Sequence, residues 1–292
     1  GARGSLTGPN GARCAVPLTD IVSDTTTAVH AALASPSSAE AHQARDRWRH
    51  RLADPPEPLD LPTDRPRPAV QGFRGARHLH DLPPDTAHAV DALAASEHVS
   101  PYAVLLAAYA WLLHAYTGAF DLVVGAPAPG RLTAGTVEAL GLAVNVVPVR
   151  CELGAEDTFL ETVRHVASRL REALAGQRIP LPRLVEMAHP DRDPGRSPLF
   201  QTLLALQQAP SGDPVAAFLL DAGSLSIGPL QLTSRPVTTT GAQLDISLEL
   251  VRTTETLRCG LTYDTALWDA DTAARFTDHF ATLLARAVTD PE

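Results

Sequence analysis

The chain has 292 residues, of which 45% are hydrophobic and 20% charged, and its formal net charge is -9. This length and composition can bury a sizeable core in one large domain or two lobes, and the negative charge gives no support to nucleic-acid binding. No run of 18 or more apolar residues predicts a membrane span. Cys14, Cys151 and Cys259 are far apart and form neither a zinc-type spacing nor a disulfide framework, which favours a reduced, cytoplasmic setting.

The first part of the chain divides at a proline-rich segment. Residues 1–36 show no regular pattern, and a helix is predicted from about Ser38 to Leu52. Residues 54–68, "DPPEPLDLPTDRPRP", then contain six prolines in fifteen residues. Proline fixes φ and removes backbone donors, so this segment is predicted to be an extended connector. We therefore expect an N-terminal arm and connector over residues 1–67 and a main domain over residues 68–292.

Helices and strands are both predicted after the connector. Helices are expected over residues 85–96, from Ser100–Pro101 to about Tyr116, from the capping box Thr158–Glu161 to Gly176, and from about 271 to 288. Strands are expected in "GFRGARHLHDL", "FDLVVGAPA", "LAVNVVPVRCEL", "PLFQTLLALQQ", "LDISLEL" and "LRCGLTYD". Pro148 places "LAVNVVPVRCEL" at an edge or a bulge, and residues 208–240 are expected to be a long loop with short strands. The mixture predicts an α/β fold, a two-layer sandwich of mixed sheet and helices.

Few residues carry a recognisable catalytic pattern. The chain lacks a nucleophile elbow, a P-loop and a dinucleotide-binding glycine fingerprint. His78 and His80 would share one strand face, but no third ligand is spaced to complete a metal site, so a solvated face is favoured. We therefore predict no metal.

The His-x-x-x-Asp pairs His42–Asp46 and His189–Asp193 are candidate acid/base pairs. His42 and Asp46 lie four apart on a predicted exposed helix, where a surface ion pair is the favoured interpretation. His189 and Asp193 lie in "HPDRDPGRSPLFQ", which is crowded with charged and turn residues. A general base must be oriented and partly desolvated, so a polar turn leading into a strand is favoured over catalysis there.

Several motifs in order resemble those of one family. "HAYTGAFDLVVGAPAPGR", "LGLAVNVVPVR", "RDPGRSPLFQ" and "LTYDTALWDADTAARF" are similar to segments in the C-terminal lobe of condensation domains from nonribosomal peptide synthetases. "GQRIPLPRLVE" matches the family's Gln-Asp-x-Pro-Phe-Glu motif in degraded form, with Arg178 in place of the acid and Leu181 in place of Phe. The resemblance covers roughly residues 40–290.

The resemblance implies a chloramphenicol-acetyltransferase-like half, the C-lobe. It also implies joining of acyl and aminoacyl groups carried on phosphopantetheine of partner carrier proteins, in nonribosomal peptide or hybrid polyketide biosynthesis. No cofactor would be bound directly, and neither nucleic acid nor membrane is expected as a partner. Arg131, Asn145 and Gln201 become candidates for substrate-tunnel or lobe-interface contacts. For Asn145 the alternative is a buried amide that satisfies a strand edge at Pro148.

The family's catalytic motif, His-His-x-x-x-Asp-Gly, does not occur in this chain. It belongs to the N-terminal lobe, so we expect that lobe to be missing or separate and assign no catalytic residue here. Arg192, Asp193 and Arg196 are expected to pin a turn by charge-assisted hydrogen bonds. The only methionine is Met187, which suggests an excised or incompletely represented piece of a longer protein.

Three functions follow from these observations. The first is a condensation-domain C-lobe that is inactive alone and active with an N-lobe. The second is a non-catalytic half-domain that docks a carrier or another partner protein. The third is a small acyltransferase acting through His189, which the wet loop around this residue disfavours. The exposed surface of the lobe would separate the first two, because a large apolar face would indicate a missing partner.

Overall fold

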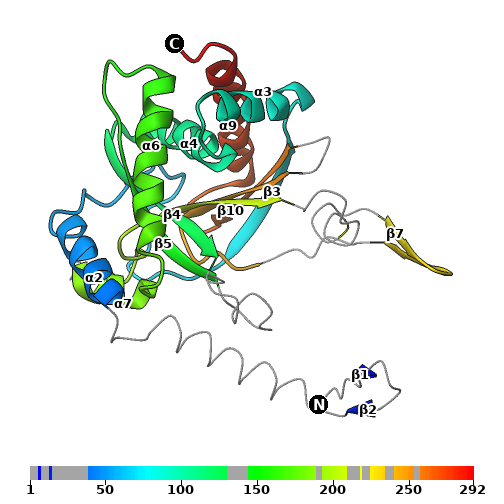
Figure 1. The fold of residues 1–292 in the computed structure, drawn as a ribbon, viewed down its shortest axis with the longest axis horizontal. Coiled ribbons are helices and arrows are strands. Elements are labelled where there is room, and N and C mark those ends of the chain that lie inside the picture. The colour runs from blue at the N-terminus through cyan, green and yellow to red at the C-terminus, as the bar shows by residue number, and fades with distance from the viewer. Residues whose placement is uncertain are drawn as a thin grey trace. The chain divides into compact units, whose positions relative to one another are not determined.

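The computed structural model describes residues 6–7, 13–14, 39–129, 144–188, 193–208, 218, 224–233, 240–252 and 257–292 (Figure 1). The chain divides into two compact units. The smaller comprises residues 1–54, 127–147 and 174–189, and the larger comprises residues 55–126, 148–173 and 190–292. The expected boundary near residue 67 stays a prediction, although the connector from Pro55 onward belongs to the larger unit.

The predicted helices form close to their expected bounds. They are α2 (Ala39–Arg51), α3 (Pro84–Ser96), α4 (Pro101–Thr117), α6 (Phe159–Ala175) and α9 (Ala270–Thr289), with an additional short helix α7 (Leu181–Ala188). Ser100 caps α4, since its hydroxyl accepts a hydrogen bond from the backbone N–H of Ala103 at 3.3 Å. Thr158 and Glu161 form the reciprocal capping box that opens α6.

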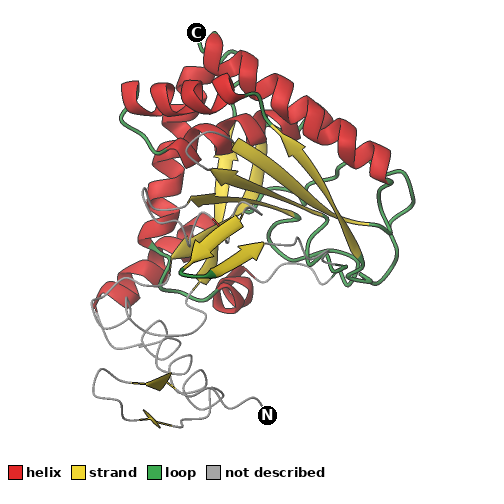
Figure 2. Cartoon of the chain, turned by 90° about the vertical axis from the view of Figure 1, so that its right-hand side faces the viewer, coloured by secondary structure: helices red, strands yellow, loops and turns green. Residues whose placement is uncertain are grey.

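One six-stranded mixed sheet organises the fold (Figure 2), and its strand order is β3-β10-β9-β6-β4-β5. The strands are β3 (Gly75–Asp81), β4 (Asp121–Pro129), β5 (Val144–Glu152), β6 (Thr202–Gln208), β9 (Ile246–Arg252) and β10 (Leu257–Asp264). β10 is antiparallel to β3 and β9, whereas β6 is parallel to β9 and β4. β5 is an edge strand, as Pro148 predicted, because an edge tolerates the missing donor.

Short strands lie outside this sheet. β1 (Leu6–Thr7) pairs with β2 (Arg13–Cys14), and β7 (Ser224–Ile227) pairs with β8 (Leu230–Thr233). The second pair falls within the expected loop of residues 208–240, where short strands were predicted. The predicted α/β class with helices layered on a mixed sheet is confirmed.

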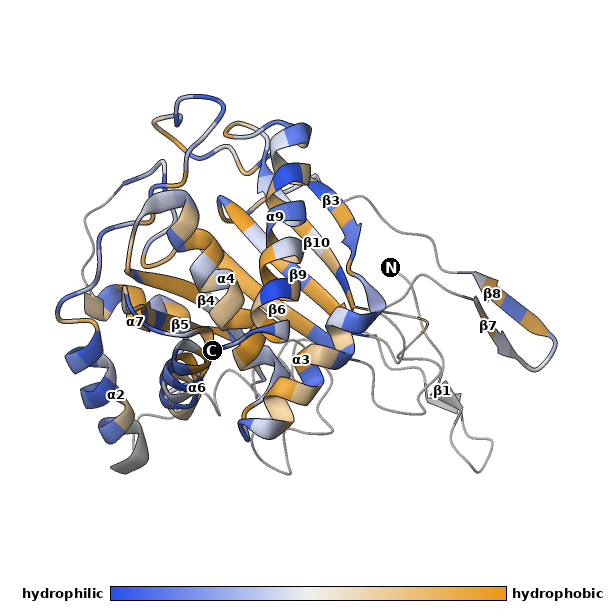
Figure 3. Cartoon of the chain, turned by 90° about the horizontal axis from the view of Figure 1, so that it is seen from above, coloured by the Kyte–Doolittle hydropathy of each residue, from blue (hydrophilic) through white to orange (hydrophobic). Residues whose placement is uncertain are grey.

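Helices α3, α4 and α9 pack against one face of the sheet, whose strands are strongly apolar beneath them (Figure 3). Tyr109 of α4 stands edge-on to Phe276 and Phe280 of α9, with ring centroids 6.4 and 6.2 Å apart. Its hydroxyl also bonds the Thr202 hydroxyl of β6. Among the described residues no single helix is long and apolar enough to cross a membrane, and α3 with α4 meets that criterion only as a pair bent by 110°.

Candidate functional site

The two faces of the sheet differ in what covers them. Strand register places Leu79, Gly260, Glu249 and Ala205 side by side on four adjacent strands. Side chains alternate along a strand, so these residues point away from the face that α3, α4 and α9 cover. We call this second face the open face, and its members are Arg77, Leu79, Asp81, Leu203, Ala205, Gln207, Ser247, Glu249, Val251, Arg258, Gly260 and Thr262.

The charges of the open face are arranged in pairs. Arg77 Nη2 lies 2.5 Å from Glu249 Oε2, and Arg258 Nε lies 2.5 Å from Asp81 Oδ1. These four side chains keep between 23% and 67% of their area exposed. Each guanidinium is therefore neutralised by a neighbouring carboxylate, so among the described residues the face presents paired charges and no concentration of one sign.

A polar row crosses four strands of this face, and we define it as Gln207, Glu249 and Arg77. Arg77 on β3 reaches over Gly260 of β10 to Glu249 on β9, and Glu249 Oε1 accepts a hydrogen bond from Gln207 Nε2 on β6. A Cβ atom at Gly260 would lie 2.5 Å from Arg77 Nη2, so the absent side chain makes room for the guanidinium. Sequence reasoning missed this row because its members lie on three different strands.

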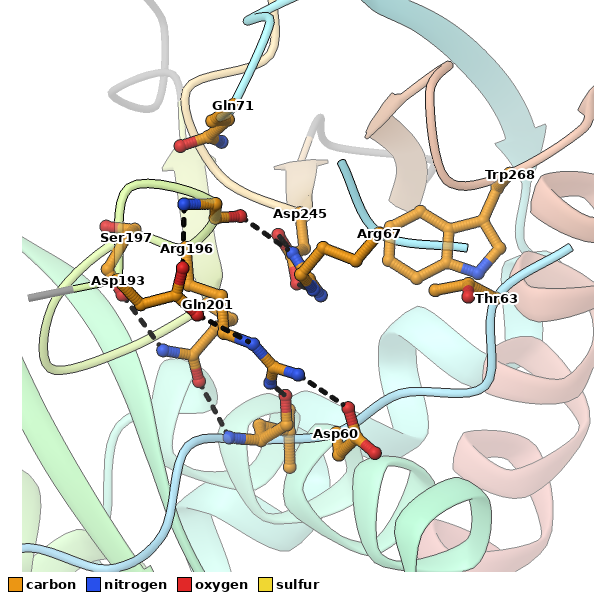
Figure 4. Close-up of polar contacts among 12 residues, drawn as sticks. Asp60, Thr63, Arg67, Gln71, Asp193, Arg196, Ser197, Gln201, Asp245 and Trp268 are labelled. Atoms are coloured by element: carbon orange, nitrogen blue, oxygen red, sulfur yellow. Dashed lines mark hydrogen bonds and ion pairs between the residues drawn. The ribbon is translucent and has the colours of Figure 1, made fainter. Parts of the chain in front are cut away.

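Gln201 lies where the connector meets the sheet (Figure 4). Its side chain is buried, its Oε1 accepts a hydrogen bond from the backbone N–H of Leu59 at 2.7 Å, and its Nε2 donates to the carbonyl of Ser197 at 2.9 Å. The amide therefore links the connector at Leu59 to the turn at Ser197. The predicted contact of Gln201 with a tunnel or a second lobe stays a prediction.

The arginine and aspartate of the predicted turn motif anchor the same segment. Arg196 donates from Nη2 to Asp60 at 2.9 Å and from Nη1 to the carbonyl of Leu59 at 3.4 Å, while its Nε lies 3.5 Å from Asp193 Oδ2 (Figure 4). Asp193 also accepts a hydrogen bond from the N–H of Gly195 at 2.8 Å. These contacts support a structural role for both residues; Arg192 lies outside the described residues.

A buried ion pair completes this anchor, and sequence reasoning did not single it out. Arg67 of the connector donates from Nη1 and Nη2 to Asp245 Oδ1 and Oδ2 at 2.8 and 2.5 Å. Only 16% and 1% of the two side chains are exposed. The hydrogen bonds to Asp245 raise the pKa of Arg67 above its usual value, so the guanidinium stays charged. The available signal was an arginine between two prolines and an aspartate immediately before a strand.

Asn145 lies in the smaller unit, at the start of β5. Its Nδ2 donates to the carbonyls of Gln177 and Ile179, both at 2.8 Å, and its Oδ1 accepts from the N–H of Leu181 at 3.2 Å. The amide therefore fastens β5 to the segment between α6 and α7. Arg131, the other predicted tunnel residue, lies outside the described residues.

His80 and Cys259, on adjacent strands, form no nucleophilic site. His80 Nδ1 lies 3.2 Å from Asp278 Oδ1, and Cys259 is the cross-strand partner of His80. However, burial raises the pKa of the Cys259 thiol to about 12, which removes its nucleophilic thiolate at neutral pH. Asp46 pairs with Arg49 at 3.0 Å on the exposed side of α2. The surface ion pair of Asp46 with His42 stays a prediction, and His189 lies outside the described residues. No group of three potential metal ligands occurs in the described part of the chain.

Comparisons with known proteins agree on one family. The sequence matches the Condensation domain family over residues 30–292. It is 40% identical to phosphinothricin tripeptide synthetase PhsB of Streptomyces viridochromogenes over 243 residues, which are 83% of this chain and 20% of that protein. It is 34% identical over 245 residues to surfactin synthase subunit 1 of Bacillus subtilis, covering 84% of this chain and 6% of that protein. The chain thus spans a fifth or less of these curated relatives.

Solved structures give the same answer for the fold. A four-domain nonribosomal peptide synthetase, holo-AB3403 bound to AMP and glycine, superposes with a TM-score of 0.82 at 28% identity, over 88% of this chain and 20% of that one. The X-domain from teicoplanin biosynthesis superposes with a TM-score of 0.76 at 25% identity, over 97% of this chain and 62% of that one. The predicted chloramphenicol-acetyltransferase-like fold is confirmed, and the chain belongs to the condensation-domain family of nonribosomal peptide synthetases.

Proposed function

We propose that this chain is the C-terminal lobe of a condensation domain and forms one wall of a tunnel for carrier-tethered substrates. The observation that carries the proposal is the match to the Condensation domain family over residues 30–292, together with a sheet face that none of α3, α4 and α9 covers. This open face holds partly exposed side chains in neutralised pairs, whereas the opposite face is packed with buried leucines. The open face is mixed and is not the large apolar surface that would by itself indicate a missing partner, so the second lobe is inferred from the family match.

The proposed reaction is aminolysis of a thioester. The amine of an acceptor held on one carrier protein attacks the thioester carbonyl of a donor held on another. The new C–N bond replaces the C–S bond, the amine loses a proton, and the donor arm leaves as a thiol. Among the described residues His279 Nδ1 lies 2.8 Å from the hydroxyl of Tyr116, but burial raises the pKa of Tyr116, which disfavours a reactive phenolate there. We therefore assign the acid/base group to an N-terminal lobe with the His-His-x-x-x-Asp-Gly motif. This lobe and the carrier proteins are the proposed partners.

Reconstitution tests the proposal. The chain is mixed with the N-terminal lobe of a condensation domain and with carrier proteins loaded with donor and acceptor, and the amide product on the acceptor carrier is measured by mass spectrometry. Product in the mixture, and none with either lobe alone, is the expected result. A matched mixture with the catalytic histidine of the N-terminal lobe replaced by alanine should give no product. Product formed by this chain alone would overturn the proposed division of labour.

A second candidate function is a non-catalytic docking module. It is favoured by the likeness to the X-domain from teicoplanin biosynthesis, whose complex with OxyB has been solved and which superposes over 96% of this chain. Under this function the chain alone would bind a carrier protein or a modifying enzyme of the same biosynthetic system. Binding measured by calorimetry without any N-terminal lobe, together with failed reconstitution, would favour docking over catalysis.

A further inference from the structure

The polar row on the open face has the features of a prepared binding site. The guanidinium of Arg77 lies on the backbone of β10, because a Cβ at Gly260 would approach its Nε and Nη2 to 2.7 and 2.5 Å. Arg77 Nε is buried there without a hydrogen-bond partner among the described residues. Leaving a buried donor unpaired costs stability, and such groups are uncommon away from functional positions. The contact with Glu249 nevertheless holds the guanidinium in place.

The polar row has one hydrogen-bond donor and one acceptor that make no hydrogen bond within the described part of the chain. Both oxygens of Glu249 are engaged, Oε2 by Arg77 Nη2 and Oε1 by Gln207 Nε2. Within the described part of the chain, no hydrogen bond is made by Arg77 Nη1 or by Gln207 Oε1. Both atoms are open to a ligand. The buried unpaired atom of this row is Arg77 Nε and not Nη1, and the Gln207 side chain is exposed. One donor and one acceptor are thus available on a carboxylate-fixed scaffold.

The charge balance of the row selects a neutral ligand. Glu249 cancels the charge of Arg77, and the neighbouring Arg258 is likewise paired with Asp81. A phosphate or carboxylate ligand would have to compete with these acids for the guanidinium groups. A secondary amide offers one N–H and one C=O and matches the free acceptor and donor without disturbing either ion pair.

We propose that the polar row binds a secondary amide of a carrier-tethered chain, with the amide N–H donating to Gln207 Oε1 and its carbonyl accepting from Arg77 Nη1. This inference rests on the proposed function, which brings such chains to the open face. The amide has two sources: the pantetheine arm, which contains amides of its own, and the backbone of a tethered peptide. The shared chemistry is the amide, and the test separates the sources.

The test is a titration of the whole isolated chain, followed by NMR shifts of glutamine side-chain amides and arginine side chains. The probes are pantetheine, N-acetylglycine N-methylamide, and methyl acetoxyacetate, the analogue of the latter that has esters in place of both amides and therefore no N–H. We expect one of the two amide probes to saturate the site and to identify its source. The ester should bind about tenfold more weakly, because a polar site rejects an analogue that leaves its acceptor unpaired. Equal binding of ester and amide would overturn the proposal.

Matched variants locate the site. Gln207→Ala should weaken amide binding about tenfold, because it removes the acceptor. Gln208→Ala changes the next residue of β6, which is also exposed but points to the other face, and should leave binding unchanged. Equal effects of the two variants, or none, would place any binding elsewhere.

The titration needs no second lobe and no transfer reaction, so its failure is distinct from that of the proposed function. If the reconstituted mixture forms product but the isolated chain does not bind the amide probes, the proposed amide site is rejected and the proposed function stands. Amide binding without transfer would leave the row standing and reject the proposed function.

Discussion

The two faces of the central sheet are built from the same strands but by different physical means. On the helix-covered face Leu204, Leu248, Leu250 and Leu261 are at most 1% exposed, so removal of apolar area from water dominates. On the open face Arg77 and Glu249 keep 29% and 23% of their side chains exposed and interact by charge and hydrogen bonds. We therefore expect the first face to determine the fold, and the second to tolerate substitution and to be where recognition can be specified.

The largest predicted loss of stability comes from a substitution on the helix-covered face. Phe280→Ala removes a fully buried ring that stands edge-on to Tyr109, and it should lower the free energy of unfolding by about 4 kcal/mol, measured by urea denaturation. The control on the open face is Leu79→Ala, whose side chain is 51% exposed, with an expected change within about 0.5 kcal/mol. Similar losses in the two variants would contradict the difference between the faces.

The next largest loss of stability is expected at a buried ion pair, and an exposed ion pair serves as its control. Asp245→Ala leaves the guanidinium of Arg67 largely buried without its carboxylate, and it should cost about 3 kcal/mol in urea denaturation. The exposed counterpart is Asp81→Ala, which removes the partner of Arg258 on the open face and should cost less than about 1 kcal/mol.

A double variant separates the pair from the packing around it. Arg67→Met with Asp245→Leu removes both charges and should recover much of the loss, because neither charge is then buried alone. A double variant as unstable as Asp245→Ala would show that the connector depends on the ion pair itself.

Two glycines of the same sheet face give a third comparison. A Cβ at Gly125 would lie 2.5 Å from the ring of Phe200, which is 3% exposed and enclosed, so Gly125→Ala should cost about 1–3 kcal/mol. A Cβ at Gly260 would meet the flexible end of Arg77, which can move away at a cost below about 1 kcal/mol. Thermal denaturation of both variants measures the difference. Equal destabilisation would mean that Arg77 is held as rigidly as the core ring.

The sequence allowed accurate prediction of elements whose signals are local. The signals for the Ser100–Pro101 start of α4 and for the Thr158–Glu161 capping box each lie within four consecutive residues, and both form as predicted. The helix α7 was not predicted, because eight residues with Pro182 in the first turn give too short a pattern. The pattern of helices and strands predicted the α/β class, and the ordered family motifs identified the chloramphenicol-acetyltransferase-like fold.

The candidate site was harder to predict from the sequence, because its contacts join residues that are distant in sequence. Arg67 and Asp245 are separated by 178 positions, and Arg77 and Glu249 by 172. Such pairings depend on strand order and register, which alternation of apolar residues does not specify. Gln201 was singled out by its place in a motif, but the motif did not predict that its amide would bind the connector backbone at Leu59.

The smallest predicted effect concerns the connector carboxylate at the start of α9. Asp64 accepts hydrogen bonds from the backbone N–H of Asp269 and the hydroxyl of Thr272, and these bonds lower its pKa below the usual 3.8. Because the folded pKa is depressed, this contribution to stability is present above pH 3.8 and is lost as the pH falls through the lower folded value. Asp64→Ala should therefore reduce the free energy of unfolding at pH 7 by less than about 1 kcal/mol.

Asp64→Asn separates capping from titration. The asparagine keeps an acceptor oxygen but cannot ionise, so it should retain most of the stability at pH 7. Urea denaturation between pH 2 and pH 7 should give a smaller loss on acidification for this variant than for the natural chain. Identical pH profiles would show that the cap of α9 does not depend on the charge of Asp64.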